Sequence, residues 1–174
     1  MHANDQRLTG AYGAGKEALL SDAPKEVQTK GYNMCGFLAR LTALSKDSGE
    51  GGNRDPLDFS LYALWAMRSA HEEKFSEIWD SAAVVRCAAV WLRYVGSKLW
   101  KLSVEGRQFE GNMAVPGDRF HELSWKGFSK GRWEVWKDGF KEAKQRGEED
   151  EVGDAVELMG KIENQGGRRF KDKK

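Results

Sequence analysis

Hydrophobic residues are most concentrated between Glu77 and Glu105, and the rest of the chain can be arranged around this stretch. Its middle, residues 82–95, is apolar at twelve of fourteen positions, and only Arg86 and Arg93 interrupt the run. A helix that is apolar nearly all round lies inside a larger helical protein. We therefore predict a buried central helix over about 77–105. The run is too short and too charged for a membrane span, which needs about 20 apolar residues, so we expect no membrane partner.

Helical periodicity predicts four further helices, over about 24–45, 56–74, 130–146 and 148–165. Pro24 and Pro56 suit first helical positions, where the missing N–H costs little. Ser129 can cap the third of these helices, and Gly147 ends it. The first helix is expected to carry Val27, Met34, Leu38, Leu41 and Ser45 along one face, with Phe37 and Leu44 beside it.

These elements predict one domain, an all-α bundle of about five to seven helices around the central helix. A chain of 174 residues suits a single domain. We expect a flexible N-terminal segment over 1–23, a helical domain over 24–165 and a basic disordered tail over 166–174, with Gly166 and Gly167 ending the last helix. The tail carries five basic residues, so a nuclear-localisation or anion-binding role would also suit it.

The charge balance argues against a strongly basic nucleic-acid-binding domain. The chain has 28 basic and 27 acidic residues and a net charge of +1, so we do not expect a nucleic-acid partner. Cys35 and Cys87 lie inside apolar helical patterns, where a free cysteine is commonly buried. The N-terminus lacks a basic region followed by an apolar one, so we expect no signal peptide and a reduced, cytoplasmic protein.

Local motifs of metal binding and catalysis are absent from the sequence. His2, His71 and His121 do not form the His-x3-His pair of a helical zinc site. The chain also lacks a Gly-x-Ser-x-Gly elbow. We therefore expect no metal and no cofactor. Cofactor-free enzymes often carry no local motif, so catalysis stays open.

The most informative chemistry is a line of residues on the central helix. Trp79, Arg86, Arg93 and Trp100 repeat every seven residues, which is close to two helical turns. Because its neighbours are apolar, we expect Arg86 to be buried, and a buried guanidinium needs a carboxylate partner. A hairpin with the preceding helix would bring acidic residues near it. The candidate partners are Glu72, Glu73, Asp80 and, next, Glu134.

Two interpretations of this line are open. A structural ion pair would fix the register of the helices, as charge networks commonly do without function. A pocket for an anionic or aromatic ligand would instead combine tryptophan walls with a few convergent polar groups, the usual make-up of a small-molecule site. The residues of that candidate pocket are Trp65, Arg68, Glu72, Trp79, Arg86, Trp91, Arg93, Trp133 and Trp136.

Three segments are distinctive: residues 61–72, residues 88–96, and residues 128–137 with their Arg-Trp-x-x-Trp run from Arg132 to Trp136. Together they resemble a family of fungal proteins classed as a domain of unknown function. The resemblance covers roughly residues 55–165. It implies an all-helical, cytosolic, fungal protein, and it assigns no catalytic residue.

The sequence favours a non-catalytic binding or accessory module for a protein partner or a small ligand, because it has amphipathic helices and no catalytic motif. The alternative is a cofactor-independent enzyme of fungal secondary metabolism that acts on an apolar small molecule in the tryptophan-lined pocket. Both the charged and aromatic central line and the resemblance to fungal proteins keep this alternative open.

Overall fold

The computed structural model describes residues 23–46, 55–74, 81–147 and 149–171. Within these ranges the chain forms five α-helices and one short 3₁₀ helix. The α-helices are α2 (Lys25–Leu44), α3 (Ser60–His71), α4 (Ser81–Glu105), α5 (Lys130–Gln145) and α6 (Glu149–Lys171), and the 3₁₀ helix η1 is Asp118–Phe120. The predicted all-α class is confirmed. The expected flexible segment lies outside the described residues except for Ala23.

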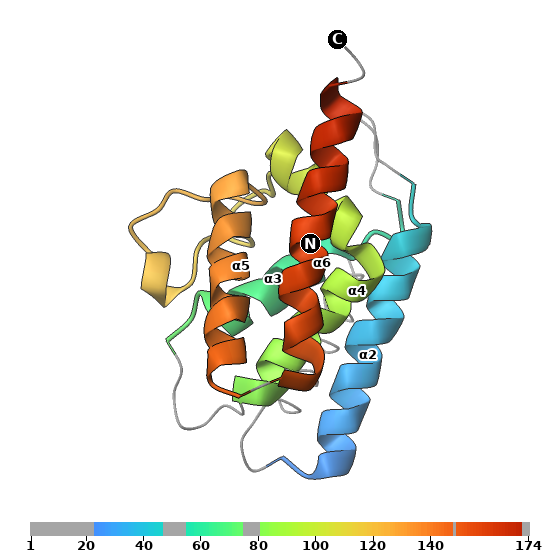
Figure 1. The fold of residues 1–174 in the computed structure, drawn as a ribbon, viewed down its shortest axis with the longest axis vertical. Coiled ribbons are helices and arrows are strands. Elements are labelled where there is room, and N and C mark those ends of the chain that lie inside the picture. Colours follow the sequence, from blue (N-terminus) through green and yellow to red (C-terminus); the bar gives the residue numbers. More distant parts are fainter. Residues whose placement is uncertain (1–22, 47–54, 75–80, 148, 172–174) are drawn as a thin grey trace.

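Helix α4 is the hub of the bundle. It contacts α2, α3, α5 and α6. Figure 1 shows α2 on one side of the molecule and α5 on the other, with α4 and α6 between them. Val85, Ala88 and Leu99 of α4 are fully buried. The predicted central helix is therefore confirmed from Ser81 to Glu105, while its expected first turn, residues 77–80, lies outside the described ranges.

Helices α2 and α4 run in the same direction with a nearly constant register. Arg40 Nη2 donates to the Tyr94 hydroxyl over 2.6 Å. Further along, Lys98 Nζ donates to the carbonyl oxygens of Thr42 (3.3 Å) and Ser45 (3.1 Å). A lysine at this position supplies donors to carbonyls that the end of α2 leaves without intrahelical partners, and its charge complements the helix dipole.

The fully buried positions of α2 hold small residues, and of the predicted face Leu38 packs against the core. Gly31, Gly36 and Ala39 are buried together with Thr42, whereas Met34 is 44% exposed. The other predicted members of the face, Val27, Leu38, Leu41 and Ser45, are only half-buried. A Cβ atom at Gly36 would lie 4.0 Å from Tyr94 Cε2, so this part of α2 faces α4 at ordinary packing distance.

Helix α3 begins at Ser60, so the predicted start at Pro56 is wrong. The Asp55 carboxylate accepts hydrogen bonds from the backbone N–H groups of Leu57 (2.9 Å) and Lys46 (3.0 Å). These bonds hold residues 55–58 in a turn, which is a common role of aspartate. The helix forms only after Asp58, whose Oδ1 accepts the N–H of Ser60 over 3.1 Å.

Helix α5 is capped as predicted, and α6 is longer than predicted. Ser129 Oγ accepts the N–H of Arg132 over 3.1 Å, and Gly147 ends the segment with a φ of +89°. The predicted end of α6 at Gly166 is wrong, because the helix continues to Lys171. A Cβ atom at Gly166 would lie 2.4 Å from Trp100 Nε1, so this glycine makes room for an indole ring rather than ending the helix.

The loop between α4 and α5 is closed at its base. Phe109 N–H donates to Lys126 O, and Phe128 N–H donates to Arg107 O, both over 2.8 Å. A Cβ atom at Gly127 would lie 1.9 Å from Arg107 O, so the two segments can approach only with glycine at this position. These contacts make residues 107–128 a single loop that leads directly into the start of α5.

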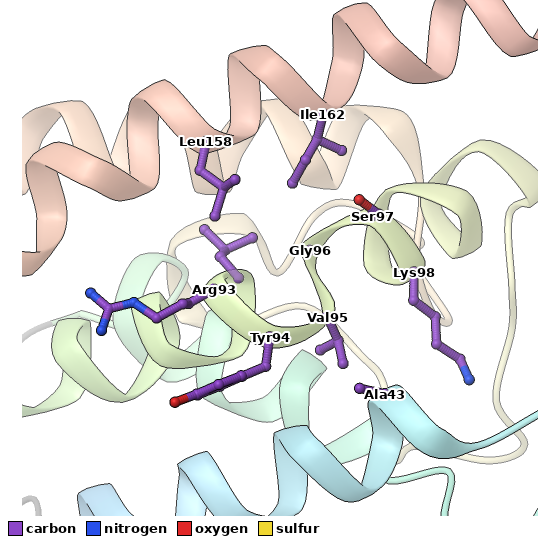
Figure 2. Close-up of a pocket in the computed structure, with 10 residues that line it drawn as sticks. Ala43, Arg93, Tyr94, Val95, Gly96, Ser97, Lys98, Leu158 and Ile162 are labelled. Carbon is purple, nitrogen blue, oxygen red and sulfur yellow. The ribbon is translucent and has the colours of Figure 1, made fainter.

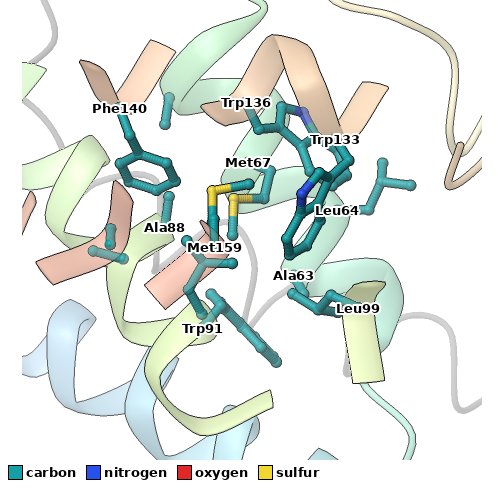
Figure 3. Close-up of a cluster of buried hydrophobic side chains, with 14 of the residues drawn as sticks. Ala63, Leu64, Met67, Ala88, Trp91, Leu99, Trp133, Trp136, Phe140 and Met159 are labelled. Atoms are coloured by element: carbon teal, nitrogen blue, oxygen red, sulfur yellow. The ribbon is translucent and has the colours of Figure 1, made fainter. Parts of the chain in front are cut away.

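Side chains from α3, α4, α5 and α6 meet in one aromatic core, which Figure 3 shows. Large members of this buried cluster are Leu64, Met67, Trp91, Leu99, Trp133, Trp136, Phe140 and Met159. Edge-to-face and tilted ring contacts connect the aromatic members, for example Trp136 with Phe128 at a centroid distance of 5.9 Å. Trp91, Trp133 and Trp136 therefore belong to the interior of the bundle.

Candidate functional site

The nine predicted site residues do not share one environment. They divide between a sealed polar cluster (Glu72, Trp136), the apolar core (Trp91, Trp133), the edge of α3 (Trp65, Arg68) and the exposed face of α4 (Arg86, Arg93). Trp79 lies outside the described residues. Each environment has a different chemical capacity.

The sealed cluster is organised around the carboxylate of Glu72. Its Oε1 accepts hydrogen bonds from Arg132 Nε (2.7 Å) and Trp136 Nε1 (2.6 Å). Its Oε2 accepts from Arg132 Nη2 (2.9 Å) and from the backbone N–H of Gly117 (3.1 Å). The side chains of Glu72 and Arg132 are both 0% exposed. The pair is bidentate, which is the strongest geometry for an arginine and a carboxylate.

The remaining donors of Arg132 bind backbone carbonyls of the loop between α4 and α5. Nη1 donates to Ala114 O (2.7 Å) and Gly127 O (3.0 Å), and Nη2 also donates to Val115 O (3.2 Å). All five guanidinium N–H groups are thereby satisfied. A buried charge pair is tolerated when its remaining hydrogen-bonding capacity is filled in this way.

The geometry makes this cluster a structural junction. It joins the end of α3, the first turn of α5 and the loop that connects α4 to α5. A Cβ atom at Gly117 would lie 2.7 Å from the backbone of Glu72, so the loop is pressed directly against α3. Since the carboxylate is saturated and sealed from solvent, it offers no free position to a ligand.

Sequence reasoning identified Glu72 and Trp136 but missed Arg132 as the charge partner. Two signals in the sequence pointed to it. Arg132 and Trp136 are four residues apart, so they share one face of a helix. Arg132 also lies three residues after the capping Ser129, at the start of a helix where the chain arrives from the loop.

The core tryptophans make contacts that link helices. Trp133 Nε1 donates to Glu163 Oε1 over 2.8 Å, which joins α5 to α6, and Lys137 Nζ binds the same carboxylate over 2.8 Å. Trp91 and Trp133 are 1% and 0% exposed. They fill the core and do not line an open cavity, so their spacing reflects packing.

Trp65 and Arg68 lie half-buried at the edge of α3 and hold the same loop. Trp65 Nε1 donates to Met113 O over 2.6 Å, and Arg68 Nη1 lies 3.4 Å from Val115 O. Arg68 Nε lies 3.2 Å from Glu73 Oε1. These contacts extend the junction to the surface, where they are partly exposed to solvent.

The expected burial of Arg86 is wrong. Arg86 and Arg93 are both exposed on α4, and Arg93 Nη2 lies 4.0 Å from Asp154 Oδ2. Two of the proposed partners bind elsewhere, Glu72 to Arg132 and Glu73 to Arg68. The physical reason is that neither α2 nor α6 covers the side of α4 that carries these arginines, so they can stay in water.

A cavity of about 250 Å³ lies beside this exposed side of α4. Figure 2 shows Ala43 of α2 on one side of it and Leu158 and Ile162 of α6 on the other, with Arg93 and Tyr94 of α4 between them. Ligand pockets usually measure roughly 300–1,000 Å³. The residues found to line this cavity include no tryptophan, so it is not the predicted tryptophan-walled pocket.

His71 is a buried, uncharged histidine next to the junction. It is 2% exposed, and its ring packs against Phe140 at a centroid distance of 4.2 Å. Burial, together with the smaller effect of the positive charges of Arg146 and Arg119, lowers the pKa of His71 to about 3. A general base should have a pKa near the working pH, so this imidazole is poorly suited to that role near neutrality.

Neither a metal-binding cluster nor a membrane-spanning helix occurs in the described ranges. They contain no group of three or more His, Cys, Asp or Glu side chains arranged to hold a metal ion. None of the helices described combines the length and the apolar character that crossing a bilayer requires.

Comparison with known proteins places the chain in a family. Residues 14–140 match the family described as "Protein of unknown function (DUF3632)". The match begins before α2 and ends in α5, so it includes the Glu72–Arg132 junction and excludes α6. No curated protein and no solved structure matches the chain. Because the match covers well over half of its length, the chain belongs to this family of unknown function.

Proposed function

We propose that this protein is a non-catalytic binding module that holds an amphipathic helix of a partner protein against the outer face of α2. The observation that carries the proposal is an apolar row on this face. Met34, Phe37 and Leu44 are 44%, 55% and 73% exposed. Leu41, which lies between them, is half-buried. Contiguous exposed apolar side chains commonly mark a protein-interaction surface.

The spacing of the row suits a helical partner. Lys30, Met34, Phe37, Leu41 and Leu44 follow one another at intervals of four, three, four and three residues. These intervals are those of the a and d positions of a heptad, where side chains of one helix insert between those of another. A partner helix with its own apolar row would therefore bury this one.

The charge at one end of the row favours an acidic partner. Lys30 occupies a position of the row and is exposed. In a parallel pair of two copies, Lys30 would meet its own equivalent, and in an antiparallel pair it would lie opposite Leu44, where residues 41–45 supply no carboxylate. An acidic side chain on a different partner would pair with the ammonium group, while the lysine stem covers the apolar row.

Two synthetic peptides can test this proposal on the full-length chain. Both carry leucine at the a and d positions of three heptads, and the flanking positions hold glutamate in one peptide and lysine in the other. We expect fluorescence anisotropy to show tighter binding of the glutamate peptide, weakened by added salt. Phe37→Asp should weaken binding by at least about tenfold, since it places a charge in the centre of the row.

Met113→Asp is the matched control, because Met113 is similarly exposed, at 40%, but lies outside α2. It should leave the affinity unchanged. Equal effects of the two substitutions, or no binding of either peptide, would overturn the proposal. Sedimentation equilibrium gives the other decisive result: self-association that Phe37→Asp abolishes would make a second copy the occupant, and the acidic-partner proposal would fail.

The enzymatic alternative has less support. Trp91, Trp133 and Trp136 are sealed in the core, and the cavity beside α4 is smaller than usual ligand pockets. Glu72 is the acidic residue among the predicted site residues, and its carboxylate already accepts four hydrogen bonds. No arrangement among the described residues favours a reaction on an apolar small molecule.

A further inference from the structure

The two cysteines of the chain come together between α2 and α4. The polar contacts between these parallel helices join residues that are 54 and 53 positions apart, Arg40 with Tyr94 and Ser45 with Lys98. Cys35 and Cys87 have nearly the same separation, so the register of the helices places them at one level. Their side chains are in hydrogen-bond contact.

The surroundings of the two thiols differ. Cys87 is 5% exposed and belongs to the core side of α4. Cys35 is half-buried and is therefore the more exposed of the two cysteines. Hydrogen bonds from the Cys87 thiol and from the side chain of Trp91 hold the pKa of Cys35 below its usual value, against the effect of burial. The more exposed of the two cysteines is therefore one whose thiol pKa is lowered.

We propose that Cys35 and Cys87 form an oxidisable thiol pair, in which Cys35 reacts with a hydroperoxide and Cys87 converts the product into a disulfide between α2 and α4. The proposal is independent of the proposed binding function, because the two thiols lie between α2 and α4 and not on the outer face of α2. Thiols in hydrogen-bond contact need only small side-chain rotations to reach the S–S bond length of about 2.05 Å.

The chemistry balances in two steps. The Cys35 thiolate attacks one oxygen of hydrogen peroxide, the O–O bond breaks, and the departing hydroxide takes up a proton as water, which leaves a sulfenic acid on Cys35. The Cys87 sulfur then attacks the Cys35 sulfur, the S–O bond breaks, and the hydroxide leaves as water with the thiol proton. The two thiols lose two electrons, and these reduce the peroxide.

The test treats the reduced full-length protein with hydrogen peroxide, removes the peroxide, alkylates the protein with iodoacetamide in urea so that the buried Cys87 is also accessible, and measures the intact mass without reductant. We expect both thiols to be alkylated before oxidation and neither afterwards, in a monomer that has lost two hydrogen atoms. Protein that retains both alkylatable thiols, gains only oxygen atoms, or forms only disulfide-linked dimers would overturn the proposal.

Two single variants assign the roles of the thiols. Cys87→Ser should stop at a sulfenic acid on Cys35 that dimedone traps, and Cys35→Ser should consume peroxide at least about tenfold more slowly, since Cys87 is buried. Faster oxidation of Cys35→Ser than of Cys87→Ser would contradict the assignment. The same two variants in urea are the control for the effect of the fold. In urea their rates of peroxide consumption should become similar. The wild-type mass measurement decides the proposal even if a variant folds poorly.

Discussion

At the scale of single residues, one buried ion pair organises the polar interior. Glu72 and Arg132 lose their hydration completely, and this loss is tolerated because every donor of the guanidinium has an acceptor in the structure. The carboxylate receives additional donors from Trp136 and from the backbone of Gly117. Removal of either charge would therefore leave the other one buried without a partner.

Glu72→Gln should lower the free energy of unfolding by about 3–5 kcal/mol, because it leaves the charge of Arg132 uncompensated in the interior. Glu73→Gln is the matched control. Glu73 binds Arg68, but the two side chains are 34% and 20% exposed, so its loss should cost less than about 1 kcal/mol. Urea unfolding measures both variants, and similar losses in the two would contradict a buried, mutually dependent pair.

His71 should make stability depend on pH. Its pKa is about 3 in the folded protein, against 6.5 for the unperturbed group, so between these values the unfolded chain binds a proton that the folded chain does not. The contribution is complete above about pH 6.5 and is lost as the pH falls, by at most about 1.4 kcal/mol per pH unit. His71→Leu should remove this part of the slope between about pH 6 and about pH 4.

Urea unfolding at several pH values checks this expectation. The variant is compared with the wild type, because carboxylates also lose stability in acid. His121→Leu serves as the control for the loss of one imidazole, since His121 is exposed and lies outside the helices of the core. A His71→Leu slope equal to that of the wild type would show that this histidine titrates normally in the folded state.

At the scale of elements, glycines determine how closely the helices approach. On α5, a Cβ atom at Gly139 would lie 2.4 Å from His71 Nδ1, whereas nothing lies within 4 Å of one at Gly131. Both glycines are helical, so both would gain helix propensity from alanine. Only Gly139 faces a packed ring. Comparison of the two positions therefore separates the effect of packing from the effect of helix propensity.

Gly139→Ala should lower the free energy of unfolding by about 1–3 kcal/mol, because the added methyl group overpacks the contact between α5 and α3. Gly131→Ala should leave stability unchanged or raise it by up to about 1 kcal/mol. Thermal and urea unfolding of the two variants give the comparison. A stabilising effect at both positions would mean that α5 can move away from His71 without loss.

The elements also show which local signals were sufficient. Ser129 before α5 and Gly147 after it acted as predicted, because a cap and a left-handed glycine operate on the adjacent backbone. Asp55 did not open a helix, since its carboxylate accepts the N–H groups of both Lys46 and Leu57 and so holds a turn. Gly166 did not end α6, since Trp100 occupies the space beside it.

At the scale of the whole molecule, the core extends beyond the segment that matches the family. The match ends at residue 140, yet α6 supplies Met159 and Ile162 to the buried cluster and Glu163 to Trp133. Helices α2 and α6 pack on different parts of α4 and do not contact each other. This arrangement leaves the outer face of α2 and the arginines of α4 exposed.

The sequence by itself determined the all-α class, the buried central helix and most helix positions, because hydrophobic periodicity and capping act over a few neighbouring residues. Only the tertiary structure decided which charges are buried and which apolar residues are exposed. Glu72 binds Arg132, which is 60 positions away, and not Arg86. Phe37 is 55% exposed, whereas Gly36 and Ala39 of the same helix are buried against the bundle. Both outcomes depend on the distances between helices, which no local pattern contains.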